Sequence, residues 1–309
     1  MEIPLAHQTQ GSGPALVHAP GAGNSAFGVD WDLPLAAITR VAGDRAPLYT
    51  DEDTFTLAGS GPLTLAPGTA ALPAPRPGGD EVTAVVRYTT TDGTGTVADR
   101  CTTTGGTFWL VRRTDGTTLL LGRSPGTRIS DPADDARVWS WLLEDAVTFN
   151  GERTHHHWEP GHTTVGSGAR PRLREVLSSP VHPQAHHPLD IPATDHQAPA
   201  WRDAYLDAVV FDYGDHTEDN TTFTPDQDPA PRPDAFTISD GGFDLTTRYL
   251  CRRILSLYRE AGAAWAPHAI LRLRYDGDPS GVRLTGVDAV AYTHDRLGAS
   301  VDFGCQETS

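Results

Sequence analysis

The chain has 309 residues with 24 basic and 40 acidic side chains, and its formal net charge is −16. All the basic side chains are arginines. Such an acidic surface repels phosphate groups, so the composition argues against binding to nucleic acid or to an anionic membrane surface. A hydrophobic content of 38% is enough to build a core, and the length suits one large domain or two small ones.

Membrane and secretory segments are not evident in the sequence. It contains no run of about 18 apolar residues, so no insertion into a membrane by the chain itself is expected. Residues 1–5 lack the basic and apolar regions of a secretory signal. The sequence therefore predicts synthesis in the cytoplasm, with later release left open. Three widely spaced cysteines (Cys101, Cys251 and Cys305) match neither a disulfide framework nor a zinc ribbon.

Strand-like alternation and turn dipeptides dominate the chain, whereas helical periodicity is scarce. Strands are predicted over 81–91, 107–113, 117–122, 206–213, 243–257, 269–275 and 282–293. Hairpin turns are predicted at Asp92-Gly93, Asp115-Gly116, Asn150-Gly151 and Asp276-Gly277. Residues 131–136 could instead begin a short helix, with Asp131 as its cap.

These elements predict an all-β fold, a large irregular antiparallel sheet or shell built of hairpins with little helix. We expect a single domain over 1–309. Three segments rich in Pro, Gly, Ala or Asp are predicted to be irregular connections, near 58–79, 182–199 and 217–233.

Residues 23–40, GNSAFGVDWDLPLAAITR, place two glycines around an aromatic pair and end in an alternating apolar run. This stretch resembles the signature of the SpvB-type domain, which opens the B component of insecticidal toxin complexes. Further blocks similar to that family follow in order at 48–59, 122–132, 141–144, 209–216 and 232–255. Asp30 and Ala36 stand where the family usually has glycine and proline.

The resemblance implies a non-enzymatic β module. In the toxin complexes this domain forms part of a closed β shell around a toxic polypeptide, so we expect a scaffold that binds a protein partner or an enclosed polypeptide. An unpaired strand edge is expected, and such an edge needs a partner or a capping device. The Ser-Thr-Ser and Glu-x-Glu elements of the family's ADP-ribosyltransferase are not found in these residues, so that activity is not carried over.

A group of histidines is the strongest candidate for a functional site. If Asn150-Gly151 forms a two-residue turn, strand alternation places His155, His157 and Glu144 on one surface. Two imidazoles and one carboxylate are the ligands of a 2-His-1-carboxylate metal site, so this set is a hypothesis for a divalent metal. The alternative is the polar outer face of a hairpin, with His156 opposite Asp145. Apart from a divalent metal at these residues, no cofactor is expected.

Other candidates have structural interpretations. The acidic groups at 51–53, 134–135 and 215–220 follow no calcium-binding pattern and favour solvated turns. Cys251 is predicted to be a core residue. Arg248, Arg252 and Arg253 are expected to pair with internal carboxylates such as Asp212 or Asp244. Most tryptophans are predicted to pack in the core, but a β-structure lined by them could hold a small hydrophobic molecule. The alternative function is therefore a small-molecule enzyme of bacterial secondary metabolism, with or without a metal, built on the same fold.

Overall fold

The computed structural model describes residues 2–5, 14–41, 43, 45–68, 70–72, 81–159, 168–181, 187–190, 199–293 and 296–304. Almost all regular structure among them is β-strand, which confirms the all-β prediction. The helical turns are short 3-10 turns: η1 (Pro125–Thr127), η2 (Pro188–Asp190) and η4 (Pro199–Ala204). No helix in the described part of the chain has the length and apolar character needed to cross a bilayer.

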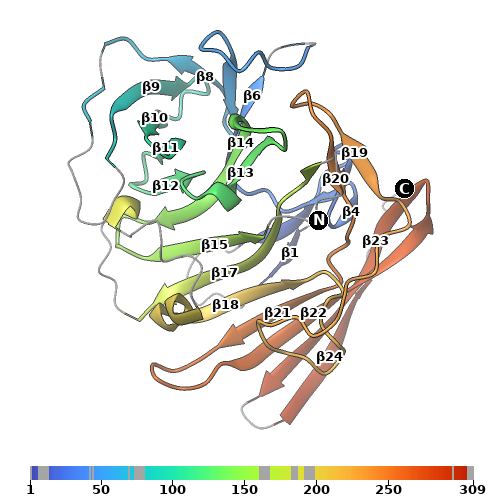
Figure 1. The fold of residues 1–309 in the computed structure, drawn as a ribbon. Coiled ribbons are helices and arrows are strands. Elements are labelled where there is room, and N and C mark those ends of the chain that lie inside the picture. The colour runs from blue at the N-terminus through green and yellow to red at the C-terminus, as the bar shows by residue number, and fades with distance from the viewer. Residues whose placement is uncertain are drawn as a thin grey trace.

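Eight strands of the main sheet close into a ring (Figure 1). The ring closes because β14 pairs with β6 near its middle and with β12 near its end. A short strand, β13 (Arg128–Asp131), also pairs with β14. The ring strands are β6 (Ala37–Val41), β7 (Thr54–Leu57), β8 (Gly61–Leu65), β9 (Ala84–Thr90), β10 (Val97–Thr103), β11 (Gly106–Arg112), β12 (Thr118–Leu121) and β14 (Asp134–Val147).

Aromatic side chains fill the ring, as the sequence predicted for most tryptophans. Trp109 and Trp141 are fully buried, with ring centroids 5.9 Å apart. Phe55 packs edge-on against Trp109 at 5.0 Å. Offset and edge-on contacts of this kind stabilise beyond the area that they bury.

From β14 the sheet continues as an antiparallel extension that ends at β24. Its last strands are long, and Figure 1 shows them running together away from the ring. The strands are, in order, β15 (Arg153–Glu159), β17 (Arg172–Pro180), β18 (Tyr205–Asp212), β21 (Arg253–Tyr258), β22 (Ala266–Asp278), β23 (Gly281–Thr293) and β24 (Arg296–Gly304).

A small N-terminal sheet covers one face of this extension. Its strands are β1 (Glu2–Pro4), β2 (Ala15–His18) and β5 (Trp31–Asp32). Leu16, Phe27 and Trp31 pack there in one core with Phe211 and Ile254 of the extension. The remaining strands are β3 (Asn24–Ser25) with β4 (Gly28–Val29), and β16 (Gly168–Ala169) with β20 (Leu245–Thr247) and β19 (Phe236–Ile238).

Several local predictions need correction. The segment 58–79 contains β8, so its Pro and Gly content does not make it irregular throughout. Asp276-Gly277 lies inside β22, and the turn comes at 278–281. Pro279 lies in this turn, because proline has no amide hydrogen to donate to a neighbouring strand. The 131–136 segment is a hairpin turn and not a helix start, because the Asp131 carboxylate accepts a hydrogen bond from the Ala133 amide at 2.9 Å. Most of 182–199 lies outside the described residues.

Candidate functional site

The hairpin that carries the histidines has a different register from the predicted one. Asp145 pairs with His155, whereas a two-residue turn would place it opposite His156. The cause is a three-residue loop, closed by hydrogen bonds between Thr148 and Glu152, in which Gly151 has a φ of 80°. A glycine in this left-handed position is typical of three-residue hairpin loops. A shift of one residue changes which side chains share a face.

The structure consequently does not gather His155, His157 and Glu144. The His155 Nδ1 lies 2.9 Å from Asp145 Oδ1, and the His157 Nδ1 lies 3.0 Å from Glu175 Oε1. Glu144 accepts hydrogen bonds instead from Ser124 and Thr127 beside η1. Metal binding by this set stays a prediction, and these hydrogen bonds do not favour it.

A second set of potential ligand atoms lies where β18 ends. Asp212, Asp215 and His216 are buried, with ligand atoms within 4.8 Å of one another, as in no other such set among the described residues. Both carboxylates form ion pairs with arginines: Arg253 lies 2.6 Å from Asp212, and Arg174 pairs with Asp215. The expected pairing of Arg253 with Asp212 is thus present. The solvated turn predicted for 215–220 is wrong for Asp215, which is 2% exposed.

His216 is the cation that completes this cluster. Its Nδ1 lies 3.2 Å from Asp215 Oδ1, and its Nε2 lies 3.2 Å from the Thr222 carbonyl oxygen. Burial alone would lower the pKa of His216, but the two neighbouring carboxylates raise it to about 9. Burial would raise the pKa of Asp212 and of Asp215, but hydrogen bonds with His216 and the neighbouring arginines hold both below the usual range. Because every ligand atom has an ionic or hydrogen-bonded partner, the cluster is an ion-pair network.

The signature stretch forms a tight hairpin that docks onto the far end of the chain. The Asn24 side chain contacts both Arg232, at 2.6 Å, and Asp234, at 3.0 Å. Asp234 also accepts a hydrogen bond from the Val282 amide of β23 at 2.8 Å. Gly28 lies against this strand so closely that a Cβ would come within 2.8 Å of the Val282 carbonyl oxygen. The glycine of the signature is therefore explained by close backbone approach.

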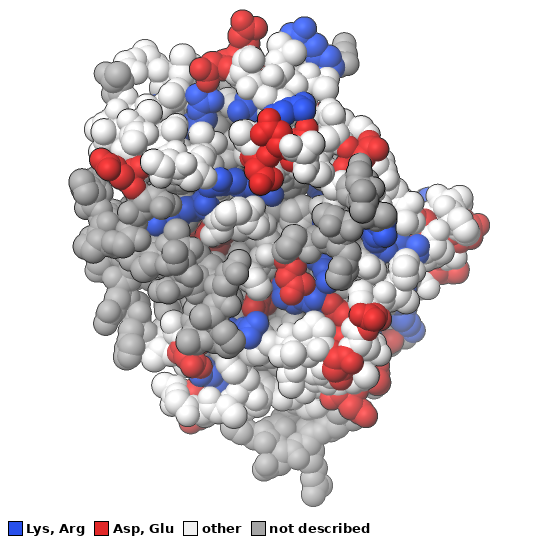
Figure 2. Space-filling model, viewed as in Figure 1, with Lys and Arg blue, Asp and Glu red and all other residues white. Residues whose placement is uncertain are grey.

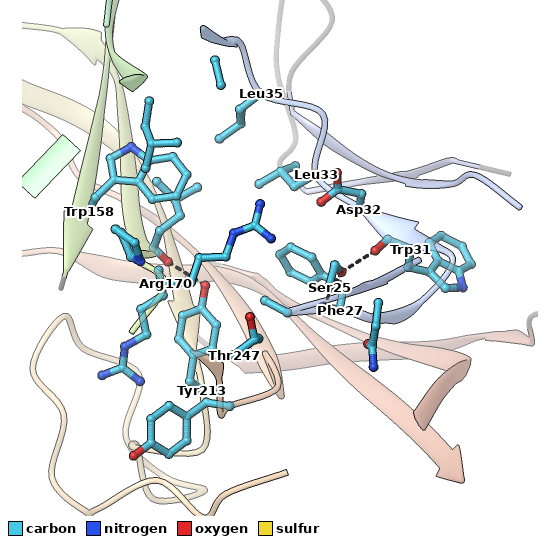
Figure 3. Close-up of a pocket in the computed structure, with 18 of the residues that line it drawn as sticks. Ser25, Phe27, Trp31, Asp32, Leu33, Leu35, Trp158, Arg170, Tyr213 and Thr247 are labelled. Atoms are coloured by element: carbon cyan, nitrogen blue, oxygen red, sulfur yellow. Dashed lines mark hydrogen bonds between the residues drawn. The ribbon is translucent and has the colours of Figure 1, made fainter. Parts of the chain in front are cut away.

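Beside this hairpin lies a cavity of about 340 Å³. Its wall comes from the signature hairpin and the segment after it, from β15, and from the residues around β16, β17 and β20. Figure 3 shows Phe27, Leu33 and Trp158 around the space, with Arg170 extending between them. Mostly apolar walls with a few polar groups are typical of small-molecule sites. No sequence pattern predicts this cavity, because its walls come from seven separate segments of the chain.

Cys251 lies in the core and is not accessible to a substrate. Cys251 is fully buried, burial raises its pKa well above the ordinary value, and its amide donates to the Ala26 carbonyl oxygen at 2.8 Å. This agrees with the predicted core role.

Charges on the surface are mixed: on the face shown in Figure 2, red and blue side chains lie interspersed.

Comparison with known proteins identifies the family. The family model described as Salmonella virulence plasmid 65kDa B protein (SpvB) matches residues 1–259. The mono(ADP-ribosyl)transferase SpvB of Salmonella typhimurium is 29% identical over 304 residues, which cover 91% of this chain and 51% of that protein. The protein of the same name from Salmonella choleraesuis is also 29% identical, over 96% of this chain and 54% of its own length. The chain thus spans about half the length of the curated relatives it matches.

Solved structures give the same result. The N-terminal domain of the effector protein SpvB from Salmonella typhimurium aligns with a TM-score of 0.78 and 25% identity, over 95% of this chain and 99% of that one. The TcdB2-TccC3-TEV crystal structure aligns with a TM-score of 0.83 and 26% identity, over 97% of this chain but 15% of that one. The Photorhabdus luminescens Tc holotoxin pore aligns with a TM-score of 0.79 and 27% identity, over 94% of this chain and 14% of that one. The chain belongs to the SpvB family, with a fold shared by Tc toxin proteins.

Proposed function

We propose that this chain is a non-enzymatic scaffold that binds a protein partner by adding a strand to its sheet. The observation that carries the proposal is the asymmetry of the main sheet. At one end β12 pairs with β14 and closes the ring, whereas β24 at the other end has β23 as its single neighbour within the described residues. An unpaired edge strand offers a row of backbone donors and acceptors to another chain.

The relatives and the contacts support this role. Tc proteins, in which the same fold makes up about 15% of a chain, are assemblies of several components. In this chain the ionisable groups at the candidate sites are engaged in ion pairs, as in Arg174 with Asp215. Groups held this way stabilise loops, whereas a catalytic group must be available to a substrate.

A photo-cross-linking experiment tests the proposal. The chain contains no lysine, so amine-directed reagents do not react with its side chains, and the probe must be placed genetically. We would introduce a photoreactive amino acid at Leu297 or Val301 of β24, with a matched control at Thr56 of ring strand β7, and irradiate cells that naturally make the protein.

Strand addition predicts cross-links from β24 and none from the control. It also predicts slower amide exchange in β24 when the captured partner is added to the purified chain. Cross-links that are equal at both positions, or partner binding without protection of β24, would contradict the proposal.

A further inference from the structure

We propose that the cavity beside the signature hairpin binds a small apolar monocarboxylate, an aryl or acyl acid whose carboxylate contacts Arg172. This inference goes beyond the scaffold role and does not depend on the β24 edge. It rests on three observations: an arginine at the cavity wall that shares its carboxylates with a second arginine, two buried donor atoms of that arginine without a hydrogen-bond partner among the described residues, and apolar walls around it.

Arg172 carries the positive charge that lacks a full partner. The ion-pair network next to the cavity contains three carboxylates (Glu159, Asp212 and Asp215) and four cations (Arg172, Arg174, Arg253 and protonated His216). A further carboxylate, Glu218, has its own arginine, Arg272. Because Arg172 and Arg174 share Glu159 and Asp215, Arg172 has no carboxylate of its own, and an added anion would supply one.

The weakest ion pairs in this network belong to Arg172. Its Nη2 lies 3.4 Å from Glu159 and 3.7 Å from Asp215, both of which make shorter contacts with Arg174. The arginine donors Nε and Nη1 are buried and have no hydrogen-bond partner among the described residues. Buried donors without an acceptor cost free energy, and a carboxylate accepts from a guanidinium in a two-point arrangement.

Two tyrosines fix the guanidinium of Arg172 in place. It lies 5.2 Å from the ring centroids of both Tyr213 and Tyr249, and all three residues line the cavity. The Tyr213 hydroxyl donates to the Leu173 carbonyl oxygen at 3.0 Å, which orients its ring. An arginine held in this way is pre-organised, so less side-chain entropy is lost when an anion binds.

The remaining walls fit an apolar body. Phe27, Leu33, Leu142 and Trp158 line the space, which Figure 3 shows between the signature hairpin and β15. Two further arginines, Arg170 and Arg248, also line the cavity, and Arg170 interacts electrostatically with Asp32. A volume of about 340 Å³ lies in the lower range of small-molecule pockets, which favours a compact acid.

Isothermal titration calorimetry with two probes that differ mainly in charge tests this inference. Indole-3-acetate and its neutral amide, indole-3-acetamide, have nearly the same shape. We expect the acid to bind the wild-type chain at least tenfold more tightly than the amide. Decanoate compared with decanamide repeats the test with an acyl body.

Three variants locate the binding. Arg172→Gln should weaken the acid at least tenfold and leave the amide unchanged, whereas Arg283→Gln, at an exposed position outside the cavity wall, should change both by less than threefold. Leu35→Trp enlarges a side chain of the cavity wall and should abolish binding of both probes, with thermal unfolding used to check that the variant is folded.

Four results would overturn the inference: no binding of either acid to the wild-type chain, equal affinity for acid and amide, full acid binding in the folded Leu35→Trp variant, or protection of the cavity by a protein partner. If a protein partner protects the cavity from the probes in competition, the site is a docking site for that partner and the small-acid assignment fails.

Discussion

The Asn24 side chain donates a hydrogen bond to Asp234 at 3.0 Å across 210 residues of sequence. Arg232, two residues before Asp234 in the same segment, contacts both Asn24 and Asp234, and its side chain is fully buried. Burial alone would raise the pKa of Asp234, but Arg232 and the other donors lower it to about 2. The signature hairpin is thus fixed to the rest of the domain by a buried ion pair.

Removing the carboxylate of this pair should destabilise the protein strongly. Asp234→Ala leaves the buried Arg232 guanidinium unpaired, which typically costs about 3–5 kcal/mol. Guanidinium chloride unfolding would measure the loss. The double variant Arg232→Leu/Asp234→Ala should be more stable than Asp234→Ala alone, because it removes the unpaired charge. A loss below about 1 kcal/mol in the single variant would contradict a stabilising role for this pair.

Stability should also depend on the protonation of His216. The folded-state pKa of about 9 lies above the ordinary value of 6.5, so the stabilisation is complete below pH 6.5 and disappears as the pH rises through 9. The shift corresponds to about 3 kcal/mol. Urea unfolding of wild type and His216→Asn should therefore show a stability difference that shrinks across this range. A difference that stays constant between pH 6 and 10 would contradict a charged His216.

Strands could be predicted from the sequence because their information is local. The alternation in 107–113 and 282–293 reappears as β11 and β23, within one or two residues at each end. The closure of the ring could not be predicted in this way. It depends on the pairing of Leu119 with Ala146, which no local periodicity encodes.

The candidate sites were less predictable than the strands for the same reason. Placing His155 opposite Asp145 depends on the number of residues in one loop, and Asn150-Gly151 is compatible with two or three. The partners of Asp215 come from β17 and from its own loop, so burial of this carboxylate has no signal in the acidic run 215–220.

Metal binding at the histidine hairpin can be tested directly. Because His155 and His157 already contact Asp145 and Glu175, we expect the double variant His155→Ala/His157→Ala to contain as much divalent metal as the wild type. Inductively coupled plasma mass spectrometry of untagged protein would measure this, with Glu144→Gln as a parallel variant. One metal per wild-type chain that is lost in the double variant would restore the hypothesis of a metal site there.

The three-residue loop predicts a specific cost for replacing its glycine. Gly151 has a φ of 80°, where a side chain costs roughly 1–2 kcal/mol, so Gly151→Ala should lower stability by about 1 kcal/mol. Asn150→Ala, at the exposed neighbouring position, is the matched control and should change stability by less than about 0.5 kcal/mol. Thermal unfolding would compare the two. Equal effects would argue against the loop geometry that sets the histidine register.

Asp30 offers the sharpest test of how this chain departs from the family signature. It occupies a usual glycine position and keeps a left-handed φ of 63°, while its carboxylate accepts a hydrogen bond from the Gly21 amide at 2.9 Å. Asp30→Gly relieves strain of about 1 kcal/mol but loses an exposed hydrogen bond of about 0.5 kcal/mol. Asp30→Ala keeps the strain and loses the bond. We therefore expect denaturant unfolding to rank the glycine variant at or above wild type and the alanine variant lowest. An alanine variant as stable as the glycine variant would mean that the backbone at this position relaxes out of the left-handed region.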